Sequence, residues 1–172
     1  DLSWAVEVVH ECVGLARRSG LVEVALGLED ASRARPENIA ALGRAARAAG
    51  AFRLRLADTV GVADPAIILE LVQAGRESGL EVGVHCHNDF GMATANTLAA
   101  LGAGADWGDV TLLGLGERAG NSRLEEVLAF LVLRKAAPVY DLAAALALAR
   151  RLAAPGADCL LYTSDAADEE DS

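Results

Sequence analysis

The chain has 172 residues, of which 53% are hydrophobic and only 4% aromatic, and its formal net charge at pH 7 is −10. This length suffices for one domain with a core of its own. The acidic balance argues against a general nucleic-acid binder, which needs clustered Lys and Arg to neutralise phosphates. No uninterrupted apolar run is long enough to span a bilayer, so we expect neither nucleic acid nor a membrane as a partner.

The three cysteines give no sign of an oxidising compartment. Cys12, Cys86 and Cys159 form no Cys-X-X-Cys pair and no disulfide framework. We therefore expect the protein in a reducing cytoplasm. Ala, Val and Leu supply most of the apolar bulk, which favours helices packed on a parallel sheet over an aromatic-rich β-sandwich.

Helical and strand patterns alternate along the chain. The first helix is predicted to start at Ser3 as its N-cap, and the third to follow the cap Asp64 with Pro65 in its first turn. The predicted helices cover residues 3–20, 36–50, 65–79, 92–102, 122–135 and 142–152. The predicted strands cover residues 21–28, 52–57, 80–87 and 109–113.

This alternation with short connections predicts a parallel α/β sheet with right-handed crossovers. Each predicted strand ends in a polar cluster, at Glu29-Asp30, Asp58-Thr59, His85–Asp89 and Glu117–Asn121. A (β/α)8 barrel builds its site from the loops after all its strands, whereas an open doubly wound sheet concentrates it in one crevice. The pattern therefore favours a TIM barrel, and the predicted strands are half of one, so we expect the front half to precede this segment.

Three regions are predicted along the chain. Residues 1–137 form the partial barrel, residues 138–157 a helical extension, and residues 158–172 a disordered tail. The segment from Cys159 onward has no apolar periodicity and is acidic, as in disordered segments. It also resembles translated adapter DNA from sequencing libraries, so a non-biological origin is a second interpretation.

The most informative stretch is Val84-His85-Cys86-His87-Asn88-Asp89-Phe90-Gly91. Residues two apart on a strand point to the same face, so His85 and His87 can converge on one point. Two neutral imidazoles at the end of a buried strand suit a divalent metal. The alternative is a pair of histidines that hydrogen-bond at a polar strand end. Cys86 should point to the opposite face, as a small buried hydrophobe.

Several other polar residues are candidates for the same rim. Asn121 follows a glycine-rich loop and either contacts the metal or caps the next helix. Arg118 either meets an anionic group or pairs with Glu117. Thr59 can donate its hydroxyl to a substrate carboxylate or satisfy a turn, and Asp89 can orient a ligand histidine.

Three motifs in order together resemble a known family. They are Ala57–Gly61 with Asp64-Pro65, His85–Asp89 with Gly91–Asn96, and Gly114–Asn121. The chain is similar to the metal-dependent carbon–carbon condensing and cleaving barrels, which include homocitrate synthase, 2-isopropylmalate synthase and 3-hydroxy-3-methylglutaryl-CoA lyase. The resemblance covers about residues 1–135 and implies barrel strands five to eight.

The resemblance implies a Claisen-type condensation of acetyl-CoA with a 2-keto acid. His85 and His87 would be metal ligands, Asn121 would lie at the metal, and Thr59 would contact the keto acid. The metal would be Zn, Mn, Mg, Co or Fe, since imidazole and oxygen donors admit all of these. The family also implies a homodimer for the complete protein.

Within the family, Glu29–Arg33 and Asn96–Ala100 look closest to the homocitrate synthases of nitrogen-fixing bacteria, which implies 2-oxoglutarate as the keto acid. Glu29 would lie toward the substrate, and Glu29 and Arg118 are the catalytic candidates. The alternatives are a 2-isopropylmalate or citramalate synthase, a hydroxyacyl-CoA lyase, or a non-catalytic barrel fragment. The family's first-strand motif, with an arginine and a metal-binding acid, has no counterpart in these residues, so we expect the fragment to be inactive alone.

Overall fold

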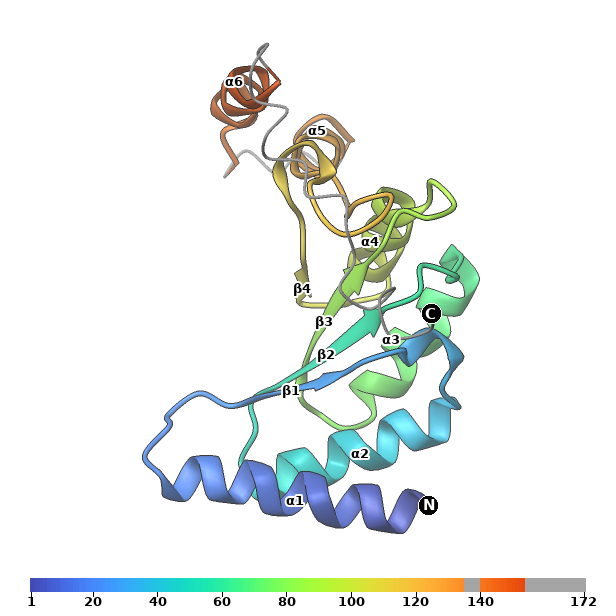
Figure 1. The fold of residues 1–172 in the computed structure, drawn as a ribbon, viewed down its shortest axis with the longest axis vertical. Helices are drawn as coiled ribbons and strands as arrows, with labels where there is room; N and C mark the ends of the chain where they lie inside the picture. The colour runs from blue at the N-terminus through green and yellow to red at the C-terminus, as the bar shows by residue number, and fades with distance from the viewer. Residues whose placement is uncertain (135–139, 154–172) are drawn as a thin grey trace, which may run out of the picture.

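A four-stranded parallel sheet in the order β1-β2-β3-β4 forms the centre of the computed structural model, which describes residues 1–134 and 140–153 (Figure 1). The strands are β1 (Ala25–Leu28), β2 (Arg53–Asp58), β3 (Glu81–Cys86) and β4 (Trp107–Gly108). The α-helices are α1 (Leu2–Arg18), α2 (Pro36–Ala49), α3 (Pro65–Arg76), α4 (Ala93–Gly102), α5 (Leu124–Arg134) and α6 (Leu142–Leu152). Two short 3-10 helices are η1 (Ala31–Arg33) and η2 (Leu112–Gly114).

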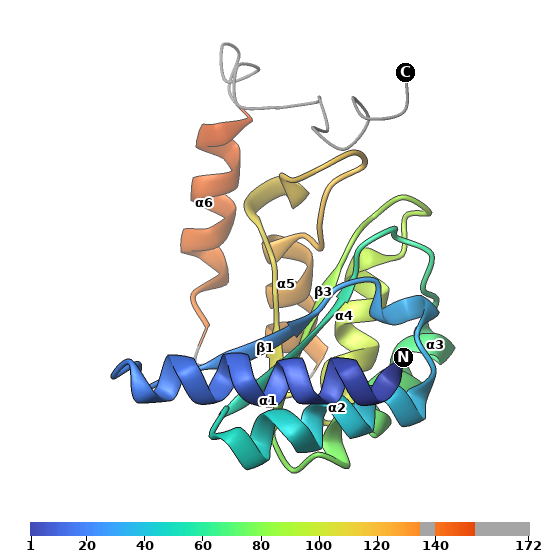
Figure 2. The ribbon, with the colours of Figure 1, turned by 60° about the horizontal axis from the view of Figure 1, so that its bottom comes forward.

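The helices that connect the strands lie on one side of the sheet. In Figure 1, α2, α3 and α4 cover this side and the opposite side of the strands is open. Helix α1 lies against α2, and α6 lies beside α5 (Figure 2). This arrangement confirms the predicted half of a (β/α)8 barrel. None of the helices in the described ranges combines the length and apolar character needed to cross a membrane.

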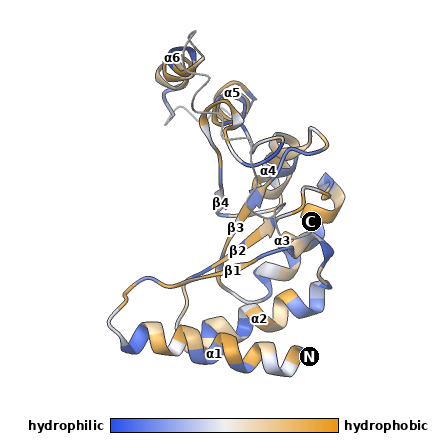
Figure 3. Ribbon diagram, in the orientation of Figure 1, coloured by the Kyte–Doolittle hydropathy of each residue, from blue (hydrophilic) through white to orange (hydrophobic). Residues whose placement is uncertain are grey.

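The two faces of the sheet differ in chemistry because strand residues alternate. Leu54, Val82 and Val84 point toward the helices and are at most 1% exposed. Arg55 and His85 alternate with them and point to the other side, which we call the open face. The parallel register pairs Leu54 with Val82, so the apolar residues of neighbouring strands form one layer. Figure 3 shows the matching alternation of polar and apolar residues along α1 and α2.

The observed N-cap of α3 is the predicted residue, whereas the observed N-cap of α1 is not. The Asp64 carboxylate accepts a hydrogen bond from the Ile67 backbone N–H at 2.9 Å, and Pro65 opens α3 as predicted. Ser3 was the wrong cap for α1. The carboxylate of Asp1 caps that helix and accepts from the Ser3 N–H at 3.1 Å.

The strands at the two edges of the sheet are shorter than predicted. β1 begins at Ala25 rather than Leu21, and β4 ends at Gly108 instead of covering residues 109–113. After Asp109 the chain no longer pairs with β3, because Thr111 pairs with the residues at the start of α5. Its N–H donates to the Ser122 carbonyl at 3.0 Å, and its carbonyl accepts from Leu124 at 2.9 Å. The apolar pair at 112–113 therefore forms a turn, with Leu113 at a φ of 60°.

The end of the chain is only partly described. Helix α6 confirms the predicted helix at 142–152. The predicted tail from residue 158 onward and the end of the preceding helix at Lys135 lie outside the described residues. The predicted boundaries at 137 and 157 also fall there and stay predictions.

Candidate metal centre

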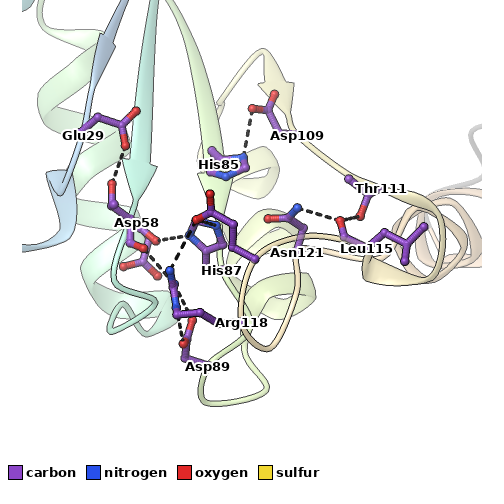
Figure 4. Close-up of polar contacts among 12 residues, drawn as sticks. Glu29, Asp58, His85, His87, Asp89, Asp109, Thr111, Leu115, Arg118 and Asn121 are labelled. Carbon is purple, nitrogen blue, oxygen red and sulfur yellow. Dashed lines mark hydrogen bonds and ion pairs between the residues drawn. The ribbon is translucent and has the colours of Figure 1, made fainter. Parts of the chain in front are cut away.

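The two histidines of the His-X-His motif point into one cavity at the carboxyl end of the sheet. Their ring centroids lie 4.8 Å apart and the ring planes are nearly perpendicular, at 88° (Figure 4). The cavity has a volume of about 400 Å³. It is lined by Glu29, Arg55, Thr59, His85, His87, Gly116, Glu117 and Asn121. The predicted convergence of the two rings is thus present in the structure.

The ring of His87 is fixed by the main chain of the neighbouring strand. Its Nδ1 lies 3.0 Å from the carbonyl oxygen of Asp58, and the residue is only 6% exposed. A carbonyl oxygen only accepts, so Nδ1 carries the proton and Nε2 keeps a lone pair for a cation. The Nε2 atom lies 4.0 Å from Oε2 of Glu117, a residue that also lines the cavity.

Asp58 stabilises the turn that follows β2. Its carboxylate is 1% exposed and accepts from the Val62 and Ala63 N–H groups at 3.1 and 3.2 Å. Asp58 is therefore a structural carboxylate. Its main-chain carbonyl orients His87, a task for which the sequence offered Asp89.

The ring of His85 faces a side-chain carboxylate instead of a carbonyl. Its Nδ1 is buried without a well-aligned hydrogen bond, and Oδ2 of Asp109 lies 3.3 Å away. The same oxygen accepts from Nε of Arg55 at 2.7 Å. The contact with His85 and then the hydrogen bond from Arg55 lower the pKa of Asp109, and burial opposes the shift.

Asn121 supplies an amide oxygen to the same cavity. Its Nδ2 donates to the Leu115 carbonyl at 2.9 Å, which leaves Oδ1 buried and without a hydrogen-bond partner. Figure 4 shows this oxygen on the side of the histidine rings. Neither Asn121 nor Ser122 caps the next helix, because the Ser122 hydroxyl is also unpartnered and α5 begins at Leu124.

The glycine loop brings Asn121 into this position by close approach of backbone to side chain. Gly116 passes directly over the Asn121 amide, where a Cβ atom would overlap it. Behind the loop, the Asn88 N–H donates to the Gly120 carbonyl at 2.8 Å, and His87 and Asn121 form an antiparallel bridge. The loop is thus tied to the strand that carries the histidines.

The donors fit a divalent cation with open positions. Two imidazoles and one orphaned amide oxygen face the cavity, and such neutral N and O donors suit several divalent metals. Within residues 1–134 and 140–153, no group of three or more His, Cys, Asp or Glu side chains is placed to hold an ion. Cys86 is no donor: it is buried on the opposite face, and burial raises the pKa of its thiol to about 12.

Thr59 and Glu29 form a hydrogen-bonded pair at the rim. The Thr59 hydroxyl donates to Oε2 of Glu29 at 2.6 Å and accepts from the Asp30 N–H at 2.7 Å. This joins the loop after β2 to the loop after β1. Glu29 also lies 3.6 Å from a guanidinium nitrogen of Arg55. Both predicted substrate-side residues therefore lie in the cavity wall, and their contact with substrate stays a prediction.

Arg118 pairs with side-chain carboxylates, and Glu117, the partner that the sequence offered as an alternative, is one of them. Its Nε and a terminal nitrogen donate to the two oxygens of Asp89 at 2.8 and 2.9 Å. It also donates to the Thr59 carbonyl at 2.9 Å and lies 3.7 Å from Glu117. The hydrogen bond from Arg118 lowers the pKa of Asp89. Arg118 thus anchors the glycine loop, and a direct catalytic role for it stays a prediction.

Two residues at the site escaped the sequence reasoning. Arg55 lies on β2 and lines the cavity, and Asp109 contacts both Arg55 and His85. A signal existed for Arg55, because a charged residue between Leu54 and Leu56 marks the polar face of a strand. Asp109 fell inside a predicted strand, where its polar contact was not foreseen.

Comparison with known proteins agrees with this geometry. Residues 1–152 match the HMGL-like family. The chain belongs to this family. It is 48% identical over 126 residues to a 2-isopropylmalate synthase of Caldanaerobacter subterraneus, 46% identical over 130 residues to a homocitrate synthase of Frankia alni, and 48% identical over 124 residues to a protein of Methanosarcina acetivorans named as an (R)-citramalate synthase.

These matches cover 73%, 74% and 71% of this chain but 33%, 36% and 25% of the relatives. The chain thus spans about a quarter to a third of the length of these HMGL-like relatives. Among solved structures, the carboxyl transferase domain of Rhizobium etli pyruvate carboxylase superposes with a TM-score of 0.73 at 22% identity. That match covers 91% of this chain and 28% of the other, and it supports the barrel fold.

Substitution of Gly116 should disturb the placement of Asn121. We expect Gly116→Ala to displace the Asn121 amide and to lower the free energy of unfolding by about 1–3 kcal/mol, as overpacking does. The change is followed by urea unfolding and by the NMR signal of the Asn121 side-chain amide. Gly102→Ala is the matched control, because no atom lies within 4 Å of its added methyl. An unmoved Asn121 signal in Gly116→Ala would contradict the packing described above.

Proposed function

We propose that this chain forms one side of the active site of a homocitrate synthase. Such an enzyme condenses acetyl-CoA with 2-oxoglutarate in a metal-dependent reaction, and water then hydrolyses the thioester to release homocitrate and CoA. The observation that carries the proposal is the convergence of His85, His87 and the orphaned oxygen of Asn121 on one polar cavity. Membership of the HMGL-like family supports an acyl-CoA condensation. The relatives include homocitrate, isopropylmalate and citramalate synthases, so the keto acid has to be argued from the cavity.

The lining of the cavity favours a keto acid with a second carboxylate. None of the described residues that line it is Val, Leu, Ile, Met or Phe. A branched aliphatic keto acid such as 2-oxoisovalerate would find no apolar wall there, and each methylene buried in such a wall is worth about 1–3 kcal/mol of discrimination. A dicarboxylic keto acid instead needs a cation for its second carboxylate, and the guanidinium of Arg55 lines the cavity. This supports 2-oxoglutarate.

The chain's own residues have separate tasks in this proposal. His85, His87 and Asn121 hold a divalent cation, which when bound polarises the keto acid carbonyl as a Lewis acid. Glu29 lies at the rim, held by the Thr59 hydroxyl at 2.6 Å, and accepts the proton that leaves the acetyl methyl group. Arg118 keeps the glycine loop in place through Asp89.

Metal binding should depend on the histidines of the cavity. We expect His85→Ala and His87→Ala to weaken Co²⁺ or Zn²⁺ binding by more than about tenfold, since each removes a donor. Isothermal titration of the protein that contains the complete barrel, with the metal alone, measures the affinity. His10→Ala is the control, because His10 is exposed on α1 and its loss should leave the affinity unchanged. Equal affinities in all variants would remove the metal centre from the proposal.

The reaction is tested with the protein that contains the complete barrel. We expect CoA release from acetyl-CoA with 2-oxoglutarate, and much less with 2-oxoisovalerate or pyruvate. A thiol reagent measures the released CoA. Release with 2-oxoisovalerate or pyruvate alone would identify an isopropylmalate or citramalate synthase, and cleavage of a hydroxyacyl-CoA without condensation would identify a lyase.

Removal of the charge of Glu29 should slow the chemical step in the same protein. We expect Glu29→Gln to lower kcat by about 10²–10⁴, the range that a positioned general base contributes, with little change in metal affinity. Glu37→Gln is the matched control, because both side chains are 68% exposed and Glu37 lies on α2, outside the cavity lining. A wild-type kcat in Glu29→Gln would exclude this residue as the base.

A further inference from the structure

A chain of charged contacts joins the carboxyl ends of all four strands on the open face. Glu29, after β1, lies 3.6 Å from a guanidinium nitrogen of Arg55 on β2. Arg55 donates through Nε to Asp109, just after β4, at 2.7 Å. Asp109 in turn lies 3.3 Å from Nδ1 of His85 on β3. The chain of contacts therefore ends on one of the two histidine rings.

The two rings are held in different ways. The Nδ1 of His87 faces a main-chain carbonyl at 3.0 Å, and the pairing of β2 with β3 fixes that carbonyl. The Nδ1 of His85 is buried and has the carboxylate of Asp109 as its charged neighbour. A side-chain carboxylate can rotate, so it orients a ring only if something holds the carboxylate itself. The guanidinium of Arg55 supplies that hold.

We propose that Arg55 and Asp109 are positioning residues that keep the proton of His85 on Nδ1 and direct its Nε2 into the cavity. This inference rests on the metal centre of the proposed function. A carboxylate only accepts hydrogen bonds, so Asp109, at 3.3 Å from Nδ1 of His85, favours a proton on that nitrogen over one on Nε2. Partners of this kind fix the tautomer and the orientation of a metal-binding histidine, and their loss typically weakens metal binding about 10–100-fold.

A different role for Arg55 and Asp109 would be to neutralise each other's charge on the open face. Arg53 and Glu81 provide a comparison, because they are register partners on β2 and β3, and Arg53 lies two residues before Arg55 on the same strand. Their closest charged atoms are 3.8 Å apart, and the Arg53 guanidinium also stacks on Trp107 at 3.9 Å. Neither Arg53 nor Glu81 lines the cavity. Glu81→Gln therefore removes a charge from the same face without touching the cavity.

The test observes the ring itself and needs neither metal nor activity. In the full metal-free chain, with imidazole nitrogens labelled by ¹⁵N, NMR above the titration range of histidine shows which nitrogen holds the proton. We expect His85 to hold it on Nδ1 in the wild type and to shift substantially to Nε2 in Asp109→Ala and Arg55→Gln. Asp109→Asn retains an acceptor oxygen and should restore most of the Nδ1 form. An unchanged His85 pattern in both Asp109→Ala and Arg55→Gln overturns the inference.

The signal of His87 shows in each variant whether the fold is kept, because its Nδ1 proton depends on the main chain alone. Titration with Co²⁺ provides the second readout, with about 10–100-fold weaker binding expected in Asp109→Ala and Arg55→Gln and none of this loss in Glu81→Gln. An equal loss of Co²⁺ affinity in all three variants would mean that Arg55 and Asp109 act only through general charge balance, and it would overturn the inference. If the protein that contains the complete barrel bound no metal, the proposed function would fail, and the NMR result would still decide the positioning role.

Discussion

The site depends on the parallel pairing of β2 with β3. That register places Asp58 beside Cys86, and the next residue, His87, therefore reaches the Asp58 carbonyl at 3.0 Å. The carboxylate of the same aspartate holds the following turn through Ala63 at 3.2 Å. One buried residue thus fixes both the turn that carries the rim and the ring that faces the cavity. A slip of one position would send every side chain to the opposite face and would separate the histidines from the cavity.

The division of the sheet into an apolar and a charged face follows from what covers each face. Helices pack on the side of Leu54 and Val82, where residues must be apolar. The open face carries Arg55 and His85, together with Asp109. Charges on such a face are costly to enclose unless they are paired. In a closed barrel this face becomes the interior, so the contact of Arg55 with Asp109 at 2.7 Å meets a requirement of the complete fold.

Local patterns were sufficient for some of these features and insufficient for others. Asp64 and Pro65 mark a helix start by their chemistry alone, and the two-residue spacing of His85 and His87 predicts their convergence. The end of β4 could not be read locally, because the pairing of Thr111 with Ser122 competes with strand extension. The contact between Arg55 and Asp109 joins residues 54 positions apart, so only the assembled sheet reveals it. The catalytic tasks of Glu29 and Arg118 depend on substrate and stay predictions.

The charges of the cavity link metal binding to substrate binding in the proposed reaction. Among the described residues, Glu29 and Glu117 bring two carboxylates to the cavity lining. The guanidinium groups beside them, Arg55 and Arg118, already contact Asp109 and Asp89. The three described donors, two imidazoles and an amide, bring no charge of their own. Without an ion, the excess of carboxylates repels an anionic keto acid, and a divalent cation reverses the local sign. The order of binding then follows from electrostatics, with the cation first and the keto acid second.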